Sequence, residues 1–198
     1  TIELEELINK LTLGGFEVEE ILEIAINKQT RKILDISATA NRADSLSVKG
    51  IAKEITALLD KPASSSDYTS ESLEYQKIIE KTFVPFETSQ DYSTFVTVTI
   101  ENLTNLTVPK WITEKLICSK IEPSNTLIDF QTYVLLETGY PFEFYDLEKI
   151  QKLLGTSKFE LGLKSIKNPI EFTASNEITY KLNSDILVLE ANNYPLSI

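Results

Sequence analysis

The sequence predicts an α+β protein in which a small helix–strand–helix unit precedes a mixed α/β module with late antiparallel strands. Apolar residues recur with helical spacing in residues 2–13 and 48–59, on either side of a segment that alternates as a strand does. Residues 63–72, ASSSDYTSES, are polar, as linkers are. After residue 159, short alternating segments separated by turn residues indicate antiparallel strands. We therefore expect a first unit over residues 1–62, a linker over residues 63–85 and a second module over residues 86–198.

The first unit begins with the helix over residues 2–13. We expect it to end at Gly14 and Gly15, because glycine readily adopts the left-handed conformation found at helix C-termini. FEVEEILEIAI, residues 16–26, is predicted as a strand. The charged segment NKQTRK is predicted as the turn that leads to a second strand, residues 33–36.

A second helix is predicted in TANRADSLSVKGIAKEITALLDKP. Asp44 or Ser45 is expected to cap its start, and Pro62 is expected to stop it after Lys61. Gly50 inside this helix costs about 1 kcal/mol relative to alanine. Either the close approach of a neighbouring backbone or an exposed, neutral position explains a glycine there, and the sequence leaves both open.

The second module is predicted to mix helices and strands. FVTVTI, residues 95–100, alternates with a period of two and is predicted as a strand. Pro109 is expected to open a helix in which Ile112 and Leu116 share a face. YVLLETG is predicted as a helix that ends at Gly139. Short strands are expected in FELGLKSI, PIEFTA, ITYKL and DILVLEA.

Composition restricts the chemistry that is possible. The chain of 198 residues has a formal net charge of −11, two arginines, no histidine and one cysteine, Cys118. A Ser-His-Asp triad, a histidine-ligated metal site and a CxxC pair are therefore excluded, and we expect no metal site. Cys118 is expected to be a packing residue. Phosphate binding needs clustered cations, so any RNA contact has to be local or supplied by another part of a larger assembly.

The sequence also bears on the setting of the protein. It has no apolar run of membrane-spanning length and no signal peptide, so we expect a soluble, intracellular protein with no membrane partner. It starts without methionine, which indicates that it begins inside a longer protein.

Two polar groupings are candidates for chemistry. In LIDFQTYVLLETGYPFEFYDLEKI, residues 127–150, the carboxylates of Glu143 and Asp146 are either an acid pair beside aromatic rings or a solvated face. The polar loop before the second helix carries Thr39, Asn41, Arg42 and Asp44. It either caps the helix with a local Arg–Asp pair or contacts an anion or RNA. From the residues alone, no catalytic site emerges.

Three blocks together resemble the β subunit of the bacterial and plastid type of phenylalanyl-tRNA synthetase. The first is LINKLTLGGFEVEEI, residues 7–21. The second, LDISATANRADSLSVKGIAKEITAL, resembles the family's Thr-Pro-Asn-Arg-x-Asp-x-Leu-Ser-x-x-Gly-x-Ala-Arg-Glu signature. The third, residues 108–150, resembles Pro-x-Trp followed by Thr-Asn-Tyr-Val-x-Leu-Glu-x-Gly-Gln-Pro-x-His-Ala-Phe-Asp. The chain resembles the N-terminal third of that subunit, without the oligonucleotide-binding domain that bacterial members carry between the first two blocks.

The resemblance implies a heterotetramer in which a catalytic α subunit uses ATP and magnesium to charge tRNA(Phe), while the β subunit supplies structure, tRNA contacts and, in many members, editing of tyrosyl-tRNA. It implies that this segment is not itself catalytic and binds no cofactor. Residues 86–198 become an editing-type module, truncated at its C-terminal end. In lacking the oligonucleotide-binding domain, the chain resembles plastid-encoded β subunits. The plastid stroma is therefore the expected location, with the bacterial cytoplasm as the alternative. Free-standing editing-like hydrolases and protein-interaction modules are the alternative functions.

The resemblance also assigns roles to residues. Positions that match the family pattern and are expected to hold its fold are Asn41, Arg42, Asp44, Gly50, Asp129, Glu137, Gly139, Pro141 and Asp146. Editing-pocket positions depart from it: Thr132 stands where the family has asparagine, Tyr140 where it has glutamine and Glu143 where it has histidine. An anion in place of a neutral imidazole reverses the local electrostatics, so we expect editing to be weak or lost.

Overall fold

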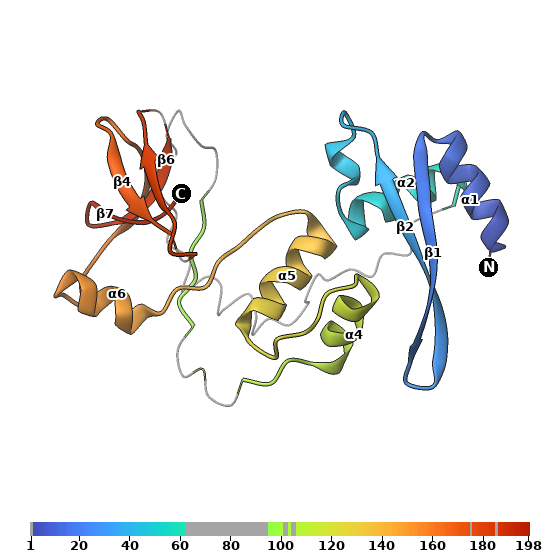
Figure 1. The fold of residues 1–198 in the computed structure, drawn as a ribbon, viewed down its shortest axis with the longest axis horizontal. Coiled ribbons are helices and arrows are strands. Elements are labelled where there is room, and N and C mark those ends of the chain that lie inside the picture. The colour runs from blue at the N-terminus through green and yellow to red at the C-terminus, as the bar shows by residue number, and fades with distance from the viewer. Residues whose placement is uncertain (1, 62–94, 101–102, 104–105, 175, 185) are drawn as a thin grey trace. The chain divides into compact units, whose positions relative to one another are not determined.

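The computed structural model describes residues 2–61, 95–100, 103, 106–174, 176–184 and 186–198 (Figure 1). The chain forms two compact units, Thr1–Asp67 with Leu103–Phe144, and Tyr68–Asn102 with Tyr145–Ile198. Both contain helices and antiparallel strands, which confirms the α+β prediction. All of the predicted linker, residues 63–85, lies outside the described residues, so the predicted division stays a prediction. Residues 103–144 belong to the same compact unit as the N-terminal segment.

The first unit contains a long antiparallel hairpin that follows helix α1 (Leu4–Leu13). Strands β1 (Phe16–Ile26) and β2 (Gln29–Ala38) pair from Phe16 opposite Ala38 to Ile26 opposite Gln29. Asn27 and Lys28 form the turn with φ values of 50° and 63°, as the favoured two-residue hairpin turn requires. The prediction of a turn over all of NKQTRK was therefore wrong, because most of those polar residues belong to β2, where their side chains are exposed.

The hairpin is held to helix α4 (Lys110–Cys118) and the turn after it by ion pairs. Glu20 and Asp35 are paired across the strands, so both carboxylates lie on one face. The Lys120 Nζ atom lies 2.8 Å from the Glu20 carboxylate and 3.6 Å from that of Asp35. Closer to the hairpin turn, the Arg31 guanidinium lies 3.2 Å from Glu114 of α4. These contacts fix one face of the hairpin against α4.

Helices α4 and α5 (Leu127–Thr138) share a small apolar core. Its buried members and the residues packed against them are Val108, Ile112, Leu116, Ile121, Phe130, Tyr133 and Leu136. The predicted shared face of Ile112 and Leu116 is confirmed, since both are buried there. Helix α5 ends at Gly139 as predicted, with φ of 79°, but starts at Leu127, six residues before the predicted YVLLETG segment.

The second unit contains helix α6 (Leu147–Leu154) and two antiparallel sheets. Strands β3 (Leu161–Ser165), β6 (Leu187–Ala191) and β7 (Tyr194–Ser197) form one sheet in the order β3-β6-β7. Strands β4 (Ile170–Thr173) and β5 (Thr179–Leu182) form the other. The four predicted late strands are confirmed, while α6 and β7 were not predicted.

The strand predicted at residues 95–100 was wrong, because this described segment has no strand assignment. Its apolar residues Val96, Val98 and Ile100 are all exposed. Alternation alone does not make a strand, which also needs a hydrogen-bonded neighbour. Among the described residues, no helix combines the length and apolar character that spanning a bilayer requires.

Helix α2 (Val48–Leu58) begins later than predicted. Ser47 is its N-cap, since its hydroxyl accepts a hydrogen bond of 3.0 Å from the Gly50 amide. The prediction that Asp44 or Ser45 caps the helix was wrong, because both lie in the 3-10 turn η1 (Ala43–Ser45). The helix also ends at Leu58, before the position predicted from Pro62, and Asp60 follows it with φ of 51°.

Gly50 lies where the backbone of η1 crosses α2. A Cβ atom there would overlap the Asp44 carbonyl oxygen and lie 3.0 Å from both the Asp44 carbonyl carbon and the Ser45 Cα. Of the two explanations that the sequence left open, close approach of a neighbouring backbone is therefore correct.

This contact reverses the usual effect of replacing a helical glycine. Gly50→Ala is expected to destabilise the protein by about 1–3 kcal/mol through overpacking, although alanine is the better helix former. Urea denaturation followed by circular dichroism measures the change. Gly162→Ala is the matched control, because a Cβ atom there meets no other atom within 4 Å. Equal stability of the two variants would contradict the assignment.

Candidate functional site

The loop between β2 and α2 is organised around the Arg42 guanidinium. A turn closes before it, with the Arg42 amide donating to the Thr39 carbonyl at 2.9 Å. The guanidinium donates to both carboxylate oxygens of Asp44 at 3.2 Å and to the Glu54 carboxylate of α2 at 2.8 Å. It also lies over the Phe16 ring, 5.1 Å from the centroid. One side chain therefore joins the loop, α2 and the start of β1.

The charges of this cluster stabilise one another. Hydrogen bonding to Asp44, and then to Glu54, raises the pKa of Arg42. The same bond from Arg42 lowers the pKa of Asp44, so both groups stay charged in the folded protein. Asn41 is exposed at the turn. Of the two roles that the sequence left open, the local Arg–Asp pair is the one the structure contains, and it uses the Nε and Nη2 donors of Arg42.

Asp129 forms a second polar cluster, at the start of α5. It is 3% exposed and accepts three hydrogen bonds of 2.8 Å, from the Ser124 amide, the Ser124 hydroxyl and the Asn125 amide. Burial alone would raise the pKa of Asp129, but these three hydrogen bonds outweigh burial and hold it below its ordinary value. The carboxylate therefore fastens the preceding turn to the helix.

The sequence analysis did not identify Ser124 and Asn125 as partners of Asp129. The sequence does contain a pattern that could have indicated them. Residues 123–126, Pro-Ser-Asn-Thr, have the composition of a turn that leads into a helix. Thr126 is the N-cap of α5, and its hydroxyl accepts from the Ile128 amide at 3.3 Å. An aspartate in the first turn also interacts favourably with the helix dipole.

Glu137, Gly139 and Asp146 also have structural contacts. Glu137 accepts from Lys115 of α4 at 3.1 Å, which ties α4 to α5. A Cβ atom at Gly139 would lie 3.4 Å from the Ser47 Cβ, so the end of α5 lies against the start of α2. Asp146 caps α6 by accepting from the Lys149 amide at 3.1 Å. This cap accounts for Asp146 without a catalytic partner.

The chain turns at Gly139 and then runs back along α5. Pro141 lies at the beginning of this returning stretch. The Gln131 side-chain amide donates to the Phe142 carbonyl at 3.0 Å. We call residues 140–144 the return segment. It brings Glu143 to the turn of α5 that carries Thr132, whereas Tyr140 lies at the opposite end of that helix.

Of the three predicted editing-pocket residues, Tyr140 and Glu143 are exposed and Thr132 is half-buried. The Thr132 hydroxyl donates to the Ile128 carbonyl at 2.9 Å, within the helix. The Tyr140 side chain is 77% exposed, and Glu143 is exposed as well. Their role in a degenerate pocket stays a prediction.

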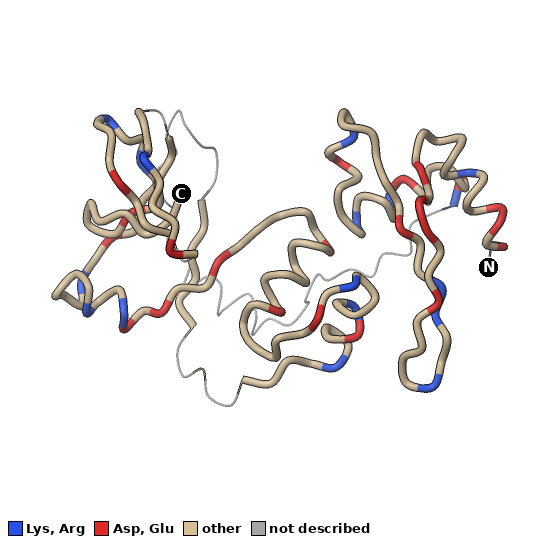
Figure 2. Tube along the Cα trace, viewed as in Figure 1, with Lys and Arg blue, Asp and Glu red and all other residues tan. Residues whose placement is uncertain are grey.

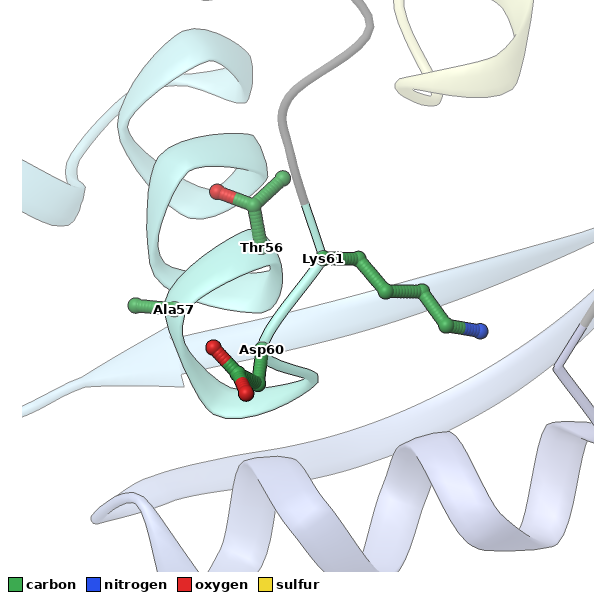
Figure 3. Close-up of a pocket in the computed structure, with 4 residues that line it drawn as sticks. All are labelled: Thr56, Ala57, Asp60 and Lys61. Atoms are coloured by element: carbon green, nitrogen blue, oxygen red, sulfur yellow. The ribbon is translucent and has the colours of Figure 1, made fainter.

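Two shallow surface hollows lie elsewhere. One, at the end of α2, is lined by Thr56, Ala57, Asp60 and Lys61 (Figure 3). The other is lined by residues 157–160 and Asn192. Neither contains a predicted site residue. Within the part of the chain that the structure describes, no three His, Cys, Asp or Glu side chains are grouped as a metal ion would need.

Comparison with known proteins gives consistent similarities. Residues 91–198 match the family described as the B3/4 domain. The chain is 49% identical over 197 residues to the chloroplastic phenylalanine–tRNA ligase beta subunit of Phaeodactylum tricornutum, which covers 100% of this chain and 28% of that protein. It is 29% identical over 198 residues to the chloroplastic subunit of Porphyra purpurea, covering 100% of this chain and 27% of that protein.

A similar protein is also found in a cyanobacterium. The phenylalanine–tRNA ligase beta subunit of Synechocystis sp. is 31% identical over 166 residues, which cover 84% of this chain and 20% of that protein. These comparisons confirm the resemblance drawn from the sequence. The chain spans less than a third of the length of these relatives.

The Asp129 cluster predicts a specific acid sensitivity. Because the folded-state pKa of Asp129 is lowered, its stabilisation is complete above the unfolded-state pKa of about 3.9 and is lost as the pH falls through the folded-state pKa. Asp129→Asn is expected to cost about 1–3 kcal/mol at neutral pH, because an amide cannot accept all three hydrogen bonds.

Urea denaturation from neutral pH down to about pH 3 measures this effect, with the stability of the variant falling less steeply than that of the wild type. Asp60→Asn, at an exposed carboxylate, is the control. Parallel pH profiles of the wild type and Asp129→Asn would contradict the role of Asp129.

Proposed function

The chain belongs to the B3/4 domain family, and from this and its similarity to phenylalanine–tRNA ligase beta subunits we propose that it is a non-catalytic segment of such a β subunit. The observation that carries the proposal is the identity of 49% across 100% of the chain. In the proposed function, the segment supports the charging of tRNA(Phe) by architecture and by positioning the tRNA. Catalysis, with ATP and magnesium, belongs to an α subunit with which the β subunit forms a heterotetramer.

The contacts of the described residues support an architectural role. The side chains of Arg42, Asp129 and Asp146 are bonded to neighbouring turns and helices. Side chains used in this way hold backbone segments in place and have fewer donors and acceptors left for a substrate. A free-standing hydrolase of mischarged tRNA, the alternative, requires an enclosed pocket around Thr132 and Glu143, and Glu143 is exposed.

The plastid stroma is the proposed location, because two of the relatives are named chloroplastic. The bacterial cytoplasm is the alternative, since a cyanobacterial subunit is also similar.

We also propose that editing of tyrosyl-tRNA is weak or absent. Hydrolysis of the aminoacyl ester needs a positioned water, and the tRNA end brings phosphates to the same place. The Glu143 carboxylate repels phosphate where the family histidine is neutral. The Thr132 hydroxyl is engaged by the Ile128 carbonyl, whereas the family asparagine offers a longer side chain with both donors and an acceptor.

The proposed function predicts an assembly-dependent ligase. The complete β subunit, co-expressed with the α subunit of the same organism, is expected to elute with it as one complex that charges tRNA(Phe) with phenylalanine in the presence of ATP and magnesium. Size-exclusion chromatography and a charging assay with radioactive phenylalanine measure both properties. Each subunit alone is the control and is expected to be inactive. A β subunit that does not associate with the α subunit would contradict the proposal.

Weak editing is a separate prediction. The whole enzyme is expected to deacylate tyrosyl-tRNA(Phe) about 100-fold more slowly than the Synechocystis enzyme, which is the size of effect that one lost acid–base or positioning group produces. Restoring the family residues with Thr132→Asn and Glu143→His together is expected to raise the rate. Glu122→His, at an exposed glutamate before α5, is the control for adding a histidine. Deacylation by the wild type at the Synechocystis rate would refute the prediction.

A further inference from the structure

The hairpin of β1 and β2 ends in a group of basic residues. We call residues 27–32, NKQTRK, the hairpin tip; all six are exposed, and three of them are Lys or Arg. Residues 24–34 contain no Asp or Glu, although the whole chain has a formal net charge of −11. Figure 2 shows a basic position at the turn of the hairpin. The tip is therefore a local concentration of positive charge on an acidic chain, which is what RNA contact by such a chain requires.

Helix α4 adds a fourth cation beside the tip. The Glu114 carboxylate accepts from the Asn27 side-chain amide and from the Arg31 guanidinium, so this part of α4 lies against the tip. Lys110 precedes Glu114 by four residues and therefore lies on the same side of α4. Lys28 and Lys110 are both exposed, and neither has an ion-pair partner within the described part of the chain. Both ammonium groups are available to an anion.

Two carboxylates in contact with these cations offset part of their charge. Glu114 lies 3.2 Å from the Arg31 guanidinium, whose Nε and Nη1 donors take no part in that bond. Glu23 lies 3.9 Å from Lys32, on the opposite face of the hairpin from Arg31. Farther from the tip, the two hairpin carboxylates that face α4 are paired with Lys120. The four cations thus outnumber the two carboxylates that they contact.

The backbone of Lys28 has a conformation that favours glycine. Lys28 is the second residue of the two-residue turn and has φ of 63°. Turns of this type need positive φ at both central residues, which is why Asn-Gly is their preferred sequence. Asn27 suits the first position, but lysine in the second position carries backbone strain. Strain of this kind is found at functional sites, and here it places an ammonium group at the end of the hairpin.

The composition of the tip favours a nucleic acid over a protein as its partner. None of residues 27–32 is apolar, and the adjoining Ile26 is buried. Protein interfaces are enriched in aromatic side chains and depleted in lysine. Exposed Lys and Arg side chains match the phosphates of a nucleic acid, which Lys binds as a point charge and Arg through its planar fork.

We propose that the hairpin tip and Lys110 contact the phosphate backbone of the tRNA that the ligase charges, an inference that rests on the proposed function. Lys28, Lys110 and the remaining donors of Arg31 are the groups that bind phosphate. A contact of this kind positions the tRNA without reading its bases. It gives an otherwise acidic segment one place at which RNA is attracted.

The test measures binding of fluorescein-labelled tRNA(Phe) to the complete β subunit assembled with its α subunit, by fluorescence anisotropy from about 50 to about 200 mM KCl. Lys28→Gly removes the ammonium group and relieves the turn, so the melting temperature is expected to stay the same or rise. Its tRNA binding is expected to weaken about five- to eightfold at about 0.1 M salt, as loss of one phosphate contact does.

Lys110→Ala is expected to weaken tRNA binding by the same factor. In each variant the slope of log K against log salt is expected to become shallower by about 0.7–0.9, the value for one phosphate contact. Lys10→Ala, at an exposed lysine of α1, removes the same charge far along the hairpin from its tip and is the matched control. It is expected to bind tRNA like the wild type.

Two results would overturn the inference while the wild type still binds tRNA(Phe). Wild-type affinity and an unchanged salt slope in both variants would show that the tRNA phosphates lie elsewhere. Loss of the α subunit from either variant complex would show that the tip contacts that subunit and not the tRNA. A wild-type complex that neither assembles nor binds tRNA(Phe) would instead reject the proposed function itself.

Discussion

The first unit depends on the close packing of η1 against α2 at Gly50. Without a side chain at this position, the Asp44 carbonyl lies against the helix. This placement allows Arg42 to reach Asp44 and Glu54 together while its guanidinium covers Phe16. The same packing sets where α2 begins, and therefore where Gly139 meets Ser47. The absence of a Cβ atom at Gly50 thus permits the contacts that connect the hairpin, α2 and α5.

Much of this arrangement could be predicted from local sequence patterns. The parts that were mispredicted depend on contacts between segments. Helical spacing correctly identified α1 and α2, and Gly139 correctly marked the end of α5. The cap of α2 was misassigned because Asp44, Ser45 and Ser47 are all favourable cap residues, and only the crossing at Gly50 selects Ser47. Residues 95–100 have the alternation of a strand, but pairing depends on a neighbour that a pattern does not reveal.

The candidate site shows a similar division between pattern and contact. Matching the family signature identified Arg42, Gly50, Asp129 and Gly139, each of which has a definite structural contact. It did not identify what Asp129 binds, because Ser124 and Asn125 precede the helix and supply mainly backbone amides, which any residue except proline offers. The exposure of Tyr140 and Glu143 could not be predicted from the sequence either, since exposure depends on how the return segment lies along α5.

Three carboxylates of residues 127–150 accept hydrogen bonds that hold the fold together. Asp129 accepts amide hydrogens of a turn, Glu137 accepts the ammonium of Lys115, and Asp146 accepts an amide at the start of α6. Each such group stabilises a backbone junction and thereby the surface built on it. Asp129 and Glu137 both belong to α5, so this helix is fastened at its start to the preceding turn and at its end to α4. The acidic composition of the segment therefore reflects, at these three positions, hydrogen bonds and an ion pair that hold the fold.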